Sequence, residues 1–95
     1  MRDILLIDDD AEILQSLAKA LSPCLGGLSL CAAGNAAEGL KLLESEKPGV
    51  VVLDLCLDQR AGIESGFSML REIRARDPHA RVIVLTGHGS TANGI

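Results

Sequence analysis

Three acidic residues in this chain stand where apolar runs end, and their side chains carry the most evident chemistry. Asp8 and Asp9 follow the apolar run Ile4–Ile7, and Asp54 interrupts the run Val50–Leu57. Because burying an ionised carboxylate without a partner costs several kcal/mol, packing alone does not account for Asp54. Carboxylates gathered in one place repel one another unless a proton or a cation neutralises them. A hard divalent cation with oxygen ligands, such as Mg²⁺, suits a cluster of this kind.

The elements that must position these residues follow from hydrophobic patterning. Short apolar runs bounded by turn residues predict buried strands. We expect four strands, at Ile4–Ile7, Leu28–Ala33, Val50–Leu55 and Arg81–Leu85. Helical patterns lie between them, with starts expected after Asp10, after Asn35 and at Gly66. Strands that alternate with helices over short connections indicate an α/β fold, with a parallel sheet and helices on both faces.

Each predicted helix has a start signal or an apolar stripe. Asp10 is placed to cap the first helix, and Asn35 with Glu38 three residues later resembles a capping box for the second. The residues expected to face the core in the first helix are Ile13, Leu14, Leu17, Ala18 and Leu21. In the second and third helices they are Ala37, Leu40 and Leu43, and then Phe67, Leu70 and Ile73. A polar loop is expected over Asp58–Ser65, before the third helix.

Parallel strands end at one edge of their sheet, so this fold gathers the acidic residues on one side. Asp8, Asp9, Asp54 and Thr86 are all expected at that edge. If the first and third strands are neighbours, the three carboxylates lie within a few ångströms of one another. Mg²⁺ beside an exposed carboxylate can support phosphoryl transfer, in which the carboxylate attacks phosphorus and the cation offsets oxyanion charge.

Composition excludes several classes of function for this segment. The 95 residues carry a net charge of −4 at pH 7, which argues against direct nucleic-acid binding. No apolar run approaches the ~20 residues of a membrane span, and the N-terminus has no signal-peptide core. The three cysteines lack metal-ligand spacing and read as reduced thiols, so a cytoplasmic location without a membrane partner is expected.

Four segments together resemble one known family. LLIDDD, VVLDL, GFSMLREIRARDP and RVIVLTGHGS, in this order, are similar to the receiver domain of two-component response regulators, particularly of transcriptional regulators. The resemblance covers essentially the whole chain, and it implies a flavodoxin-like, doubly wound parallel sheet of strand order 2-1-3-4-5. Residues 1–95 are then expected to be a receiver domain without its last strand and helices, with about four strands in the order 2-1-3-4 and three helices.

The resemblance also implies roles for individual residues. Asp54 matches the phospho-acceptor, and Thr86 matches the switch hydroxyl that moves toward the phosphoryl group. Asp8 and Asp9 match the acidic pair that holds Mg²⁺, Asp9 directly and Asp8 through water. Asp54 and the backbone carbonyl of Cys56 complete the expected metal ligands, whereas Asp10 is assigned to helix capping.

The function implied is that of a phospho-accepting signalling module, not an enzyme. A histidine kinase or phosphotransfer protein would supply the phosphoryl group, and an output domain outside this chain would receive the signal. Two positions depart from the family pattern. Asp58 stands where a Pro is usual, and the Lys of the family's fifth strand would lie beyond Ile95. Whether the 95-residue form accepts a phosphoryl group is therefore left open.

Two alternatives remain. A pseudo-receiver would keep the fold as an interaction module without phosphorylation. A fragment similar to haloacid-dehalogenase phosphatases would use Asp8 as nucleophile and Asp10 as acid/base, but it has Glu12 where a small β-branched residue is expected and leaves Asp54 unexplained.

The last strand suggests an interaction of its own. Without a fifth strand, Arg81–Leu85 becomes an apolar sheet edge, and such edges pair with other chains. We therefore expect self-association of the 95-residue form, most simply as a two-fold dimer.

Overall fold

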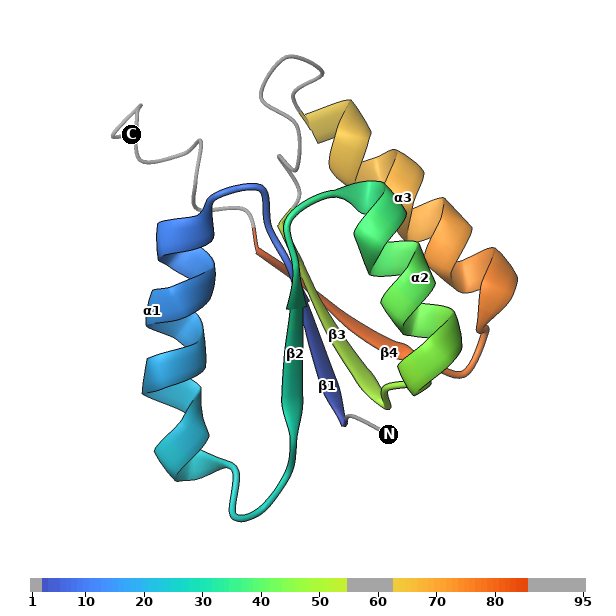
Figure 1. Cartoon of the computed structure of the whole chain (residues 1–95). Helices are drawn as coiled ribbons and strands as arrows, with labels where there is room; N and C mark the ends of the chain where they lie inside the picture. The colour runs from blue at the N-terminus through green and yellow to red at the C-terminus, as the bar shows by residue number, and fades with distance from the viewer. Residues whose placement is uncertain (1–2, 55–62, 86–95) are drawn as a thin grey trace.

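The structure is a computed structural model that describes residues 3–54 and 63–85. Within these ranges four parallel strands form one sheet of order β2-β1-β3-β4 (Figure 1). The strands are β1 (Ile4–Ile7), β2 (Leu30–Ala33), β3 (Val50–Asp54) and β4 (Arg81–Leu85). The helices are α1 (Ala11–Leu21), a short 3₁₀ turn at Ser22–Cys24, α2 (Ala36–Glu46) and α3 (Ile63–Arg76). The predicted doubly wound α/β fold is confirmed.

The larger part of the core lies on one side of the sheet. α2 and α3 cover one face, and α1 lies on the other (Figure 1). Because side chains alternate along a strand, every second residue of β1 and β3 faces α2 and α3. The buried cluster on that side includes Leu5, Ile7, Val51, Leu53, Leu43, Met69 and Ile73. The rigid layer that holds the strand ends in place is therefore formed by the sheet with α2 and α3.

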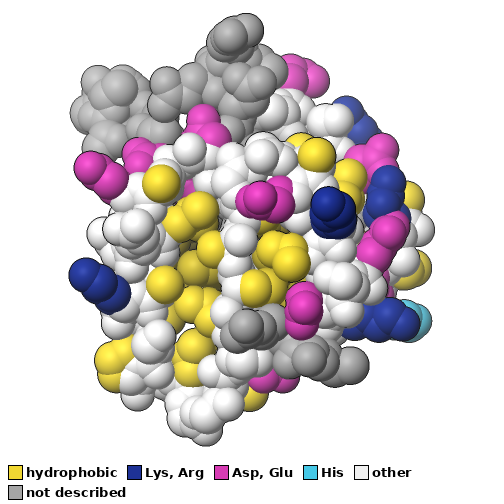
Figure 2. Space-filling view, in the orientation of Figure 1, with side chains coloured by type: hydrophobic (Ala, Val, Ile, Leu, Met, Phe, Trp, Pro, Cys, Tyr) yellow, Lys and Arg dark blue, Asp and Glu magenta, His cyan; other side chains and the backbone are white. Residues whose placement is uncertain are grey.

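The opposite face is covered more thinly. The predicted inward stripe of α1 is only half-buried, and none of the helix residues is fully buried. Figure 2 shows apolar side chains at the bottom of a hollow on the side where α1 and β2 lie. On β4, Ile83 is 53% exposed.

The predicted helix caps are confirmed. The Asp10 carboxylate accepts hydrogen bonds from the backbone N–H groups of Glu12 (2.9 Å) and Ile13 (3.3 Å), so it caps α1. The Asn35 side chain accepts one from Glu38 N–H at 2.8 Å. The reciprocal bond of a capping box runs here from Gly34 N–H to the Glu38 carboxylate at 3.0 Å. These caps fix where the helices begin after β1 and β2.

Two predicted boundaries need correction. β2 begins at Leu30 rather than Leu28, and α3 begins at Ile63 rather than Gly66. An acidic residue in the first helical turn is favourable, and Glu64 occupies that turn. The remaining residues of the predicted 58–65 loop, Asp58 to Gly62, lie outside the described ranges.

Two predicted core residues were also wrong. Phe67 is 41% exposed, because the buried stripe of α3 runs through Gly66, Met69 and Ile73, one position away from it. Ala37 is exposed as well. In α2 the inward position belongs to Gly39, where an added Cβ would lie 2.9 Å from both the Ile7 Cδ1 and Met69 Cε atoms. The small residue lets α2 approach the sheet and α3 closely.

Hydrogen bonds join the residues that immediately precede β1 and β2. The Asp3 carboxylate accepts hydrogen bonds from Ser29 N–H (2.9 Å) and Ser29 Oγ–H (3.1 Å). These donors hold the pKa of the Asp3 carboxyl below its ordinary value. Among the described residues no helix is both long enough and apolar enough to cross a membrane.

Candidate functional site

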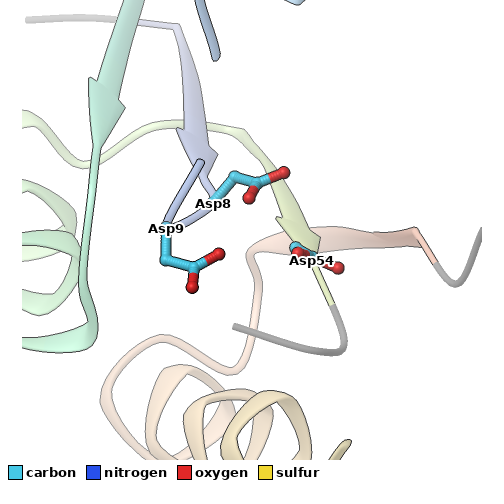
Figure 3. Close-up of side chains that lie close together, drawn as sticks. All are labelled: Asp8, Asp9 and Asp54. Atoms are coloured by element: carbon cyan, nitrogen blue, oxygen red, sulfur yellow. The ribbon is translucent and has the colours of Figure 1, made fainter. Parts of the chain in front are cut away.

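The strand register brings the acidic residues to one edge of the sheet. Ile7 pairs with Leu53, so the residues that follow them, Asp8 and Asp54, reach the edge side by side. One carboxylate oxygen from each of Asp8, Asp9 and Asp54 lies within 4.8 Å of the other two (Figure 3). The prediction that adjacent first and third strands gather three carboxylates is therefore confirmed.

The three carboxylates differ in exposure. Asp8 is 3% exposed and Asp54 is 2% exposed, whereas Asp9 is open to solvent. The carboxylate of Asp8 also accepts a hydrogen bond from the backbone N–H of Asp10 at 3.0 Å. Since Asp10 caps α1, the start of that helix and the buried carboxylate are held together. The result is a pair of buried acids with a third acid at the solvent side.

The donor set fits a hard divalent cation. All three side chains offer oxygen, which Mg²⁺ prefers, and Mg²⁺ usually keeps several waters when it is bound by few carboxylates. Oxygens that share one Mg²⁺ lie up to about 4 Å apart, because each metal–oxygen bond is about 2.1 Å. The spread of 4.8 Å within the cluster thus needs only small side-chain movements to close on an ion.

The remaining predicted site residues divide into two groups. Asp10 does not belong to the cluster and caps α1, as expected. Cys56 and Thr86 lie outside the described residues, so their predicted roles stay predictions. Leu85, which precedes Thr86, pairs with Asp54 at the end of β3 and β4. The described end of β4 therefore lies at the same sheet edge as the acidic cluster.

A pocket beside this cluster was not predicted from the sequence. A cavity of about 640 Å³ lies between α2 and α3, and Asp9 is among its lining residues. Ala36 and Ala37 line it from α2, and Ser65 and Ser68 line it from α3. The small residues on these two helices could have indicated the pocket, but only if the packing of α2 beside α3 had been known.

Comparisons with known proteins agree with the geometry. The family described as the response regulator receiver domain matches residues 4–95. The chain is 35% identical to the photosynthetic apparatus regulatory protein RegA of Cereibacter sphaeroides, over 99% of this chain and 48% of RegA. It is 36% identical to the transcriptional regulatory protein GlrR of Escherichia coli, over 97% of this chain and 19% of GlrR. The chain thus spans half or less of the length of these relatives.

Solved structures show the same likeness. A receiver domain protein from Clostridium thermocellum superposes with a TM-score of 0.78 at 35% identity, covering 98% of this chain and 71% of that one. A response regulator from Burkholderia pseudomallei has a TM-score of 0.77 at 34% identity, covering 97% of this chain and 51% of that one. With the sheet order, the acidic edge and these matches in agreement, the chain belongs to the response regulator receiver domain family.

Proposed function

We propose that Asp54 accepts a phosphoryl group and that Mg²⁺ assists the transfer. The observation that carries the proposal is the acidic cluster, with its two buried carboxylates at adjacent strand ends and its exposed third member. The Burkholderia pseudomallei relative was solved with a phosphorylated aspartic acid and a calcium ion. Asp8, Asp9, Asp54 and the backbone carbonyl of Cys56 are the proposed metal ligands.

The proposed reaction is a displacement at phosphorus. One carboxylate oxygen of Asp54 forms a bond to the phosphorus atom, and the bond between phosphorus and the donor breaks with its electron pair leaving on the donor. The product is an acyl phosphate. Bound Mg²⁺ would supply positive charge beside the phosphoryl oxygens. Asp9 offers a ligand from the solvent side and Asp8 is oriented by Asp10 N–H, while Thr86 is the proposed switch hydroxyl.

The proposed partners lie outside this chain. A histidine kinase or phosphotransfer protein donates the phosphoryl group, and an output domain reads the change. A transcriptional output is supported by relatives named as transcriptional regulators. In this role the chain is a phospho-accepting module of the cytoplasm and not an enzyme. We also propose that residues 1–95 are a receiver domain without its last strand and helices, as the 71% coverage of the Clostridium thermocellum chain supports.

Direct phosphorylation tests the central proposal. A chain extended through the family's fifth strand, incubated with acetyl phosphate and Mg²⁺, is expected to gain one phosphoryl group in mass spectrometry. Hydroxylamine should remove the group, because acyl phosphates react with it, and Asp54→Asn should never gain it. Steady hydrolysis of a phosphomonoester that requires Asp8 but not Asp54 would establish the phosphatase alternative instead. Metal binding without any phosphoryl gain would identify a pseudo-receiver.

Self-association of the 95-residue form is a further part of the proposal. In the described ranges β4 has a neighbouring strand on one side only, and Ile83 on it is largely exposed. Apolar sheet edges of this kind template pairing with another chain. We expect dimers at micromolar concentration in light scattering coupled to size exclusion, and fewer when the chain is extended through a fifth strand.

A charged substitution on β4 should distinguish pairing through this edge from nonspecific hydrophobic association. Ile83→Lys is expected to shift the chain toward monomer, because charged residues at sheet edges oppose pairing. Leu28→Lys is the matched control, since Leu28 is also about half exposed at 52% but precedes the opposite edge strand. A compact monomer for the unmodified chain, or an equal effect of both substitutions, would rule the β4 edge out.

A further inference from the structure

The pocket between α2 and α3 has the character of a small-molecule site. Its volume of about 640 Å³ falls within the range of ligand pockets, roughly 300–1,000 Å³. Such sites combine an apolar lining with a few polar groups that fix orientation. Here Leu40 and Met69 supply apolar lining, and the Ser68 hydroxyl adds a polar group.

The charged groups that line the pocket are both acidic. Asp9 comes from the end of β1, and Glu72 comes from the second half of α3. Both side chains are exposed, and among the described residues no Lys or Arg lines the pocket. Glu72 also accepts a hydrogen bond from Arg76 at 3.4 Å, a long contact that leaves its carboxylate capable of accepting others. An occupant that matches this lining carries a positive charge on an apolar body.

Asp9 belongs to two sites at once. It is a member of the acidic cluster that fits Mg²⁺, and it also lines the pocket. A carboxylate that pairs with an organic cation is less available to a metal ion, and the reverse holds equally. Thermodynamic linkage requires that each ligand lower the affinity of the other by the same factor.

We propose that the α2–α3 pocket binds a small organic cation, a primary amine or guanidinium on a compact apolar body, and that its occupant opposes metal binding through Asp9. The binding itself stands on the pocket alone. The opposition to Mg²⁺ rests on the function proposed for the acidic cluster. A ligand of this class would thereby tune how readily the chain enters its metal-loaded state.

Titration with three probes of similar size tests the binding. The probes are 4-phenylbutylamine, 4-phenylbutanol and 4-phenylbutyrate, added to the ¹⁵N-labelled chain without metal and followed by amide chemical shifts. We expect the amine to shift resonances of α2 and α3 around the pocket, the alcohol to bind more weakly, and the carboxylate not to bind there. Equal shifts for the amine and the carboxylate, or shifts away from the pocket, would overturn the proposal.

Two substitutions locate the site. Ala37→Leu places extra volume in the pocket and should abolish the shifts, while Ala20→Leu adds the same volume to an exposed position of α1 and should leave them unchanged. Glu72→Gln should lower the affinity for the amine by up to about fivefold, the upper range for an exposed ion pair, without lowering the affinity for the alcohol. Loss of both probes in Glu72→Gln, or full binding in Ala37→Leu, would contradict the assignment.

Competition separates the two parts of the proposal. Bound Mg²⁺ should lower the affinity for the amine, and bound amine should lower the affinity for Mg²⁺ by the same factor. If the amine binds but Mg²⁺ does not bind at all, the pocket stands and the function proposed for the cluster fails. If both bind without affecting each other, the link through Asp9 is wrong.

Discussion

Addition of Mg²⁺ to the metal-free chain is expected to raise its free energy of unfolding by about 2.7 kcal/mol at ~100 times the dissociation constant. The proposed ligands, the carboxylates of Asp8, Asp9 and Asp54, are assembled in the folded chain, whereas the unfolded chain has no such cluster. For a domain of this size the change corresponds to a rise of roughly 10–20 °C in melting temperature. Thermal unfolding followed by circular dichroism, from EDTA to tens of millimolar Mg²⁺, measures it.

Screening by added salt has to be separated from binding. NaCl at matched ionic strength weakens repulsion between exposed charges but supplies no divalent ligand. Glu12→Gln removes an exposed acid on the first turn of α1, outside the cluster, and should keep the full Mg²⁺ response. A melting temperature that Mg²⁺ leaves unchanged would mean that the acidic site is not assembled in this form of the chain.

Asp54→Asn is expected to stabilise the metal-free chain and to reduce its response to Mg²⁺. Asp54 is buried, and its carboxylate lies close to those of Asp8 and Asp9. Two like charges about 4 Å apart repel by about 1 kcal/mol even at the dielectric constant of water, and by more in a partly buried site. The amide keeps the shape of the side chain without the charge, so a gain of about 1 kcal/mol or more is expected in urea denaturation.

The same substitution should remove most of the Mg²⁺ stabilisation, because a neutral amide oxygen replaces a charged ligand. Glu12→Gln again serves as the control, since it changes the net charge equally without touching the cluster. If Asp54→Asn and the unmodified chain were equally stable and responded equally to Mg²⁺, Asp54 would not take part in the cluster.

Local signals allowed much of the site to be predicted. The positions of Asp8, Asp9 and Asp54 follow from the ends of two apolar runs and from the rule that parallel strands end at one edge. The caps at Asp10 and Asn35 follow from short-range hydrogen bonding, which depends on only three or four residues. Each of these features depends on residues nearby in the sequence, so it could be predicted from the sequence alone.

Features that depend on how helices meet could not be predicted in the same way. The exposure of Phe67 depends on the rotation of α3 about its axis, and Met69 and Ile73 set that rotation by packing on the sheet. Helical spacing predicts Ala37 to be in the core, yet Ala37 is exposed and lines the pocket between α2 and α3. A helical pattern indicates which side of a helix is apolar but not its exact rotation: Phe67 lies one position from the buried Gly66, and Ala37 lies two positions from the buried Gly39.

The sparse packing of α1 against the sheet affects the order in which parts of the molecule unfold. Elements with few buried apolar contacts separate from a protein at a lower free-energy cost than its core elements do. α1 has no fully buried residue, whereas α2 and α3 contribute Leu43, Met69 and Ile73 to the core. α1 is therefore the helix expected to detach in sub-global unfolding while the sheet persists.

Such detachment would reach the acidic edge through Asp10. Asp10 caps α1 with its side chain and orients the Asp8 carboxylate with its backbone N–H. When α1 frays from this end, the Asp8 carboxylate loses the hydrogen bond from Asp10 N–H. A cation held by the proposed site would then also slow the fraying of α1, so that metal binding at the strand ends would lengthen the lifetime of a helix on the opposite face of the sheet.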